Sequence, residues 1–90
     1  MTVAEMASIL ELMKKSFEFS ATSWFRSPKR NAKVGGNPKS KHLIGLGVDV
    51  IPDDWSILGA FTALANVHDL SVLDEGDHWH IQPRAGNRRR

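Results

Sequence analysis

The chain has 90 residues, which is enough for one small domain with a single modest core and leaves no room for a separate binding module. Its hydrophobic fraction of 41% is that of an ordinary globular protein and argues against wholesale disorder. The formal net charge is small, +2, and the absence of cysteine excludes disulfides and thiolate metal ligands.

The two ends of the chain give expectations about location. No segment approaches the roughly 20 apolar residues needed to span a bilayer, so we expect no membrane insertion. Glu5 and Glu11 interrupt the first apolar stretch, so no signal peptide is evident, and action outside the cytoplasm requires another route of export or release. Residues 87–90 predict a solvated basic tail behind a domain spanning 1–86. The tail alternatively favours an anionic polymer, but no interleaved aromatic stripe supports nucleic-acid binding.

The first half of the chain predicts two helices and a strand. Apolar residues at helical spacing predict an amphipathic helix over 4–15 that packs on the core. Alternation over 17–24 predicts a strand. Ser27 and Pro28 suit the N-cap and first turn of a short helix, which ends before the Gly and Pro residues of 35–38.

The second half predicts a strand, a helix and two more strands. Residues 44–51 are apolar and punctuated by glycine, which is typical of a buried strand. A second amphipathic helix begins at 52–54, and strands follow at 70–73 and 78–83. This order implies an α+β fold, in which helices pack against a small antiparallel sheet in a single compact domain.

The last predicted strand carries two histidines on one face. Side chains two residues apart on a strand point the same way, so His78, His80 and Gln82 share a face, while Trp79 and Ile81 face the core. The strand can therefore present two imidazoles to a cleft. His80 is a good candidate for a metal ligand, and His78 is either a second ligand or a donor to a reacting carbonyl group.

A third histidine and an aspartate can join them. Asp49 lies on the strand that follows His42, and Gly45 and Gly47 between them allow a tight turn, so the two side chains can converge. Zinc accepts this mixture of nitrogen and oxygen ligands and keeps a position for water, whose proton Asp77 can accept if it lies within reach. The spacing alone fits a metal-free polar cluster equally well.

Four segments of the chain form an ordered set of motifs. They are Ser23-Trp24-Phe25-Arg26-Ser27-Pro28, Val34-Gly35-Gly36 with Asn31 before it, Ser40-Lys41-His42-Leu43-Ile44-Gly45-Leu46-Gly47-Val48-Asp49, and Asp77-His78-Trp79-His80. This order resembles the zinc D-alanyl-D-alanine carboxypeptidase family, which includes the L-alanyl-D-glutamate endopeptidases of phage endolysins. The resemblance runs from about residue 23 to residue 82.

The resemblance implies an enzyme, a zinc metallopeptidase, with Zn²⁺ held by His42, Asp49 and His80 and with Asp77 as general base. The substrate it implies is the peptidoglycan stem peptide, cut as by a D-Ala-D-Ala carboxypeptidase or an L-Ala-D-Glu endopeptidase. We then expect a monomeric, phage-derived lysin that acts on the bacterial cell wall, released from the host cytoplasm or carried in a virion.

Three further residues receive roles from the same resemblance. It implies that Arg26 binds the substrate carbonyl or carboxylate and stabilises the oxyanion, that Ser40 lines the substrate cleft, and that His78 assists transition-state stabilisation. Without the resemblance, Arg26 also fits a plain surface residue. The alternative for the whole chain is a non-catalytic, metal-stapled structural domain of a phage virion or tail assembly, because so small a core gains much from a bound ion.

Overall fold

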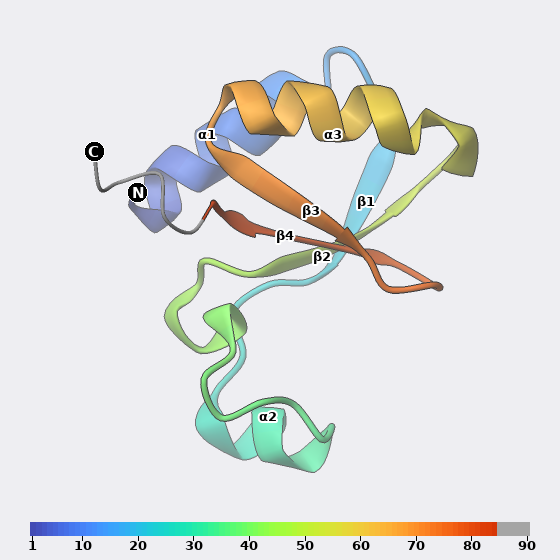
Figure 1. Cartoon of the computed structure of the whole chain (residues 1–90). Helices are drawn as coiled ribbons and strands as arrows, with labels where there is room; N and C mark the ends of the chain where they lie inside the picture. The colour runs from blue at the N-terminus through green and yellow to red at the C-terminus, as the bar shows by residue number, and fades with distance from the viewer. Residues whose placement is uncertain (85–90) are drawn as a thin grey trace.

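A four-stranded antiparallel sheet organises the computed structural model, which describes residues 1–84 (Figure 1). Its spatial order is β1-β2-β4-β3, and each neighbouring pair is antiparallel. The strands are β1 (Phe19–Ser23), β2 (Val48–Pro52), β3 (Leu70–Asp74) and β4 (Trp79–Pro83).

Two helices cover one face of the sheet, α1 (Val3–Met13) and α3 (Leu58–Val67) (Figure 1). Helix α1 begins with a capping box, in which Thr2 accepts from the backbone of Glu5 and the Glu5 side chain accepts from the Thr2 backbone. Its buried side chains recur at helical spacing and meet the apolar face of the sheet, so burial and capping together fix this helix.

The core lies between these helices and the sheet. Alternate residues of β2 and β4 point into it, and the core side chains below 2% exposure include Val48, Val50, Phe61, Trp79 and Ile81. The intervening residues of the same strands therefore face the other side of the sheet. The predicted α+β class and the predicted core position of Trp79 and Ile81 are confirmed.

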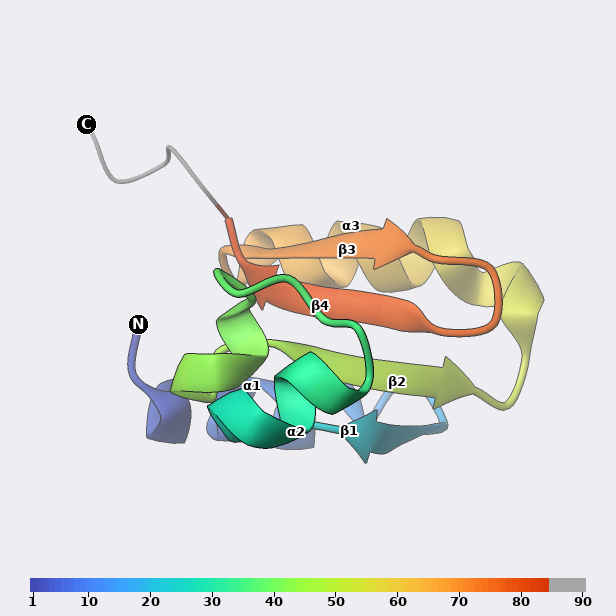
Figure 2. The same cartoon turned by 90° about the horizontal axis from the view of Figure 1, so that it is seen from below.

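The opposite face of the sheet carries a small lobe, which we call the α2 lobe and define as residues 26–41 (Figures 1 and 2). It contains helix α2 (Pro28–Lys33), whose first turn is capped by the Ser27 side chain, and the loop that follows. This short helix is confirmed where the sequence predicted it. The lobe stands apart from the sheet in Figure 1, and a cleft lies between them.

Two predicted boundaries are wrong. The strand predicted over 44–51 begins only at Val48, because 3-10 helix η1 (Lys41–Ile44) precedes it and Gly45 turns the chain with a φ of 75°. The second amphipathic helix begins later than 52–54. Pro52 ends β2, and the 3-10 helix η2 (Trp55–Ile57) leads into α3.

The described residues contain no helix long and apolar enough to cross a membrane. The predicted basic tail, 87–90, and the end of the predicted domain at residue 86 lie outside the described residues.

Candidate metal centre

The strand register places the predicted site residues of the sheet side by side. Asp49 of β2 lies directly opposite His80 of β4, and Leu73 of β3 lies opposite His80 on its other side. A bulge at the end of β1 brings Ser23 opposite Asp49. Directly opposed side chains in antiparallel pairs are about 5 Å apart at Cβ. A row therefore crosses the sheet face that looks toward the α2 lobe, formed by Ser23, Asp49, His80 and Leu73.

His42 reaches this row from η1. Ser40 caps that turn by accepting from the His42 backbone N–H, and the left-handed conformation of Gly45 ends it. The Trp24 indole N–H donates to the Gly45 carbonyl oxygen at 2.8 Å, which ties η1 to the chain leaving β1. As a result the residue His42 is only 3% exposed, and its Nε2 lies 3.2 Å from Asp49 Oδ1.

The hydrogen bonds of His42 define which of its nitrogens is free. Nδ1 lies 2.6 Å from the carbonyl oxygen of Trp24, which can only accept, so Nδ1 carries the proton and donates it. In the neutral ring Nε2 then holds a lone pair, and that lone pair faces the carboxylate of Asp49. A second partner that fixes the tautomer in this way is typical of metal-binding histidines.

His80 repeats the same arrangement with its nitrogens exchanged. Its Nε2 faces Gln82 Oε1 at 2.8 Å, with the amide oriented so that the oxygen accepts, and its Nδ1 faces Asp49 Oδ1 at 2.9 Å. Lone pairs from two neutral rings and one carboxylate therefore meet at one point. A single metal ion could accept all three lone pairs at once.

The donor set suits zinc. Ligand atoms of His42, Asp49 and His80 all lie within 4.8 Å of one another, and two imidazoles with one carboxylate are a common three-residue set for a zinc ion that keeps an open position. The site is also sheltered, with the Asp49 side chain 13% exposed. The structure thus brings together the three residues predicted as ligands.

His78 stands at the edge of this centre between two other carboxylates. Its Nδ1 is 2.6 Å from Asp77 Oδ1, and its Nε2 is 2.9 Å from Glu75 Oε1 and 3.7 Å from Asp49 Oδ1. Burial lowers the pKa of His78, but the hydrogen bond to Asp77 and the charges of Asp49 and Glu75 outweigh it, so the pKa is raised above its ordinary value. The ring is therefore disposed to act as a cationic donor.

Asp77 lies farther out than the sequence suggested. Its side chain is 91% exposed and contacts Nδ1 of His78. Glu75, not Asp77, lines the cleft beside the metal centre. The hydrogen bond from His78 and the charge of that ring lower the pKa of Asp77, which keeps the carboxylate ionised at neutral pH.

Sequence reasoning missed Glu75, because Asp74, Glu75 and Gly76 have the composition of an ordinary turn. Only the fold of the β3–β4 hairpin reveals that this turn closes one side of the cleft, with Glu75 directed at His78. The spacing of three residues between Glu75 and His78 was the one indication in the sequence that the two side chains could interact, and it is a weak one.

Arg26 is held by a small cradle in the α2 lobe. Its Nη1 donates to Asn31 Oδ1 at 2.9 Å and its Nη2 to Ser23 Oγ at 3.3 Å, which leaves Nη2 3.8 Å from Asp49 Oδ2. Asn31 is 3% exposed and donates in turn to the Asn37 carbonyl oxygen. Gly36 packs so closely on Asn31 and Arg26 that no Cβ fits there.

The cleft joins these groups into one surface. Its lining includes seven residues singled out from the sequence, and Glu75, which was not; the seven are Arg26, Ser40, His42, Asp49, His78, His80 and Gln82. Another hollow lies at the far end of the molecule between α1 and the end of β4, and none of the predicted site residues lines it.

We predict one zinc ion per chain, held by the three converging lone pairs. His42→Ala and His80→Ala should each weaken zinc binding by roughly 100-fold or more, because each removes a ligand and leaves Asp49 short of a partner. Isothermal titration calorimetry measures the affinity and stoichiometry. His68→Ala is the matched control, since His68 lies at the end of α3 away from the cleft. Unchanged binding by the His42→Ala protein would contradict the assignment.

We also predict opposite effects of alanine at two glycines. Gly36→Ala should destabilise the fold by about 1–3 kcal/mol, because the added Cβ forces Asn31 and Arg26 to move. Gly59→Ala should stabilise it by roughly 0.5–1 kcal/mol, because Gly59 is helical with open space around it. Urea unfolding measures both. If Gly36→Ala costs nothing, the cradle around Arg26 is not closely packed.

Comparison with known proteins agrees with the resemblance derived from the motifs. The sequence model of the family described as Peptidase M15 matches residues 1–82, which is most of the chain and includes every predicted site residue. Neither the curated proteins nor the solved structures contain a significant match. The fold, the converging ligand set and the family match support one conclusion: this chain belongs to the peptidase M15 family.

Proposed function

We propose that the chain is a zinc-dependent peptidase that hydrolyses peptide bonds in the stem peptides of peptidoglycan, as a D-Ala-D-Ala carboxypeptidase or L-Ala-D-Glu endopeptidase. Family membership supports peptidase activity. The observation that carries the proposal is the convergence of two histidine lone pairs on the Asp49 carboxylate at the floor of a cleft. The ordered motifs support the choice of substrate and a phage-type lysin that acts on the bacterial wall.

The metal supplies what the side chains cannot. A zinc ion held by His42, Asp49 and His80 would contribute Lewis acidity, which lowers the pKa of water and polarises a carbonyl group. The chain's own residues then bind the peptide, hold the reacting groups in place and move the proton.

Two basic side chains, Arg26 and His78, flank the centre and line the cleft. Arg26 is fixed by Asn31 and Ser23, and its charge is suited to a substrate carbonyl or carboxylate. His78 Nε2 lies 2.9 Å from Glu75 Oε1 and 3.7 Å from Asp49 Oδ1, and on turning from Glu75 it can donate to the oxyanion that forms when the amide is attacked. The preset position of Arg26 avoids reorganisation during the reaction, which is where donors of this kind contribute most.

Asp77 acts as the base together with His78. Its carboxylate is ionised and holds His78 Nδ1, so it sets the orientation of the ring and neutralises its charge. Because Asp77 lies outside the cleft lining, we propose that the proton released by water reaches Asp77 through a short relay at the rim. Ser40 supports the opposite wall, where it lines the cleft and caps the turn that carries His42.

The direct test is mass spectrometry of purified muropeptides after incubation with the zinc-loaded protein. We expect loss of D-alanine or release of the L-alanine end, and we expect a chelator to abolish the cleavage and added zinc to restore it. Cleavage that survives complete removal of metal contradicts the mechanism. Zinc binding that stabilises the fold, without cleavage of any wall preparation, favours the metal-stapled structural domain instead.

Asp77→Ala tests the role of the base independently of zinc binding. We expect kcat to fall by roughly 100-fold or more, because a positioned proton acceptor is lost. Zinc affinity should stay close to that of the wild type, because Asp77 contacts His78 and none of the three ligands. Asp77→Glu should recover part of the rate. If Asp77→Ala cuts muropeptides at the wild-type rate, the assigned role is wrong.

A further inference from the structure

Charge is divided sharply along the chain. Between Phe19 and Val48 there are six cationic residues and no acidic one, whereas all ten acidic residues lie before or after this stretch. The other described segments, 1–18 and 49–84, contain only three lysines and arginines. A net charge of +2 therefore hides two oppositely charged parts of one small domain.

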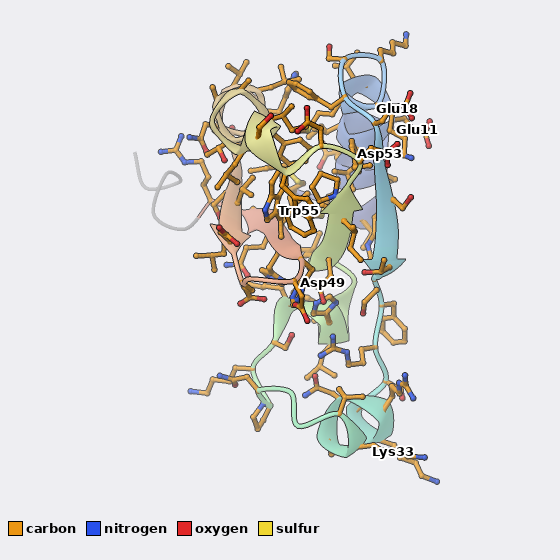
Figure 3. The ribbon with its side chains drawn as sticks, turned by 90° about the vertical axis from the view of Figure 1, so that its right-hand side faces the viewer. Glu11, Glu18, Lys33, Asp49, Asp53 and Trp55 are labelled. Atoms are coloured by element: carbon orange, nitrogen blue, oxygen red, sulfur yellow. The ribbon has the colours of Figure 1, made fainter. Side chains whose placement is uncertain are left out.

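The fold gathers the six cations in one projecting lobe, whereas the acidic residues are spread over the sheet, the helices and the cleft wall. All six cations belong to the α2 lobe, which projects from the sheet. Figure 3 shows Lys33 at the tip of the lobe, directed away from the body, and shows Glu11, Glu18 and Asp53 at the other end. Within residues 1–84 the lobe therefore forms a cationic end, and the cleft lies between that end and the sheet.

Five of the six cations are available to a partner. Arg26 faces Asp49, but the others are exposed and form no ion pair within residues 1–84; they are Lys29, Arg30, Lys33, Lys39 and Lys41. Repulsion among unpaired like charges costs stability, and a bound polyanion removes that cost. Lys39 and Lys41 also line the cleft of the metal centre, so such a partner would lie beside the bond to be cut.

We propose that the α2 lobe binds a phosphodiester-rich anionic polymer of the bacterial wall, of the poly(glycerol phosphate) type, and so holds the enzyme beside its stem peptides. The choice of a wall polymer rests on the proposed function. Phosphodiesters remain ionised at every physiological pH, and both lysine and the guanidinium fork of arginine bind them well. Repeated charges along a flexible chain match a surface of separate, exposed cations.

Nucleic acid fits this surface less well. Helix α2 has six residues and is about 9 Å long, which is short for an element that reads a groove. Binding of single strands relies on several aromatic platforms, and Phe25, 65% exposed, is the one strongly exposed aromatic side chain beside the lobe in the described part of the chain.

The test is fluorescence anisotropy of labelled poly(glycerol phosphate) with the zinc-loaded full chain. We expect binding that weakens by more than about tenfold between 50 and 200 mM salt, because several phosphates release counterions. Lys29→Gln with Lys33→Gln should weaken it by about tenfold and reduce the salt dependence. Lys29→Arg with Lys33→Arg should bind like the wild type.

A matched control removes two charges from elsewhere. Lys15→Gln with Arg84→Gln should bind the polymer within about twofold of the wild type, because both positions lie outside the lobe. Circular dichroism checks the fold of each variant. Absent binding at 50 mM salt, or equal loss in both double variants, overturns the proposal. Equally tight binding of DNA at the same phosphate concentration overturns the assignment to a wall polymer.

The same measurement keeps this proposal apart from the proposed function. Anisotropy needs no peptide cleavage, and the muropeptide assay uses short fragments that carry no polymer. Charge-dependent polymer binding without muropeptide cleavage would support the binding surface and contradict the proposed peptidase activity. Cleavage of muropeptides without polymer binding would do the reverse.

Discussion

The carboxylate of Asp49 is the group around which the site is organised. Oδ1 faces nitrogens of His42, His80 and His78, and Oδ2 faces Arg26. These partners come from three different parts of the chain. Burying a carboxylate costs folding free energy unless cations or hydrogen-bond donors surround it. Three histidine nitrogens lie near Asp49 Oδ1, which is more than one anion needs. This arrangement fits a group of ligands that could hold a metal ion.

The rest of the fold serves to hold these partners in place. The register between β2 and β4 fixes Asp49 against His80, and the burial of alternate residues on the other face prevents that register from slipping. A one-residue slip of either strand would turn its site side chain, Asp49 or His80, into the core. Trp24 connects the site to η1 through two hydrogen bonds, so the position of His42 depends on the end of β1 as well. The geometry of the site thus depends on the packing of the core. In so small a domain, a change in core packing would therefore also displace the site residues.

Much of this was predictable from the sequence because it depends on local periodicity. Alternation in β4 correctly separated the core face of Trp79 from the site face of His80, and Ser27 with Pro28 correctly marked the start of α2. The boundary of β2 was not predictable, because residues 44–47 are apolar enough for a strand and only tertiary contacts select the η1 turn. The cradle around Arg26 and the approach of Glu75 to His78 also depend on segments that meet only in the folded chain.

We expect one metal ion to sit where the lone pairs of His42, Asp49 and His80 meet. Anomalous diffraction at the zinc absorption edge, from crystals of the zinc-loaded protein, tests it most directly. We expect a single strong peak within bonding distance of His42 Nε2, an Asp49 carboxylate oxygen and His80 Nδ1. A peak between Glu75 and His78 instead, or no ordered peak in crystals that retain zinc, would contradict it.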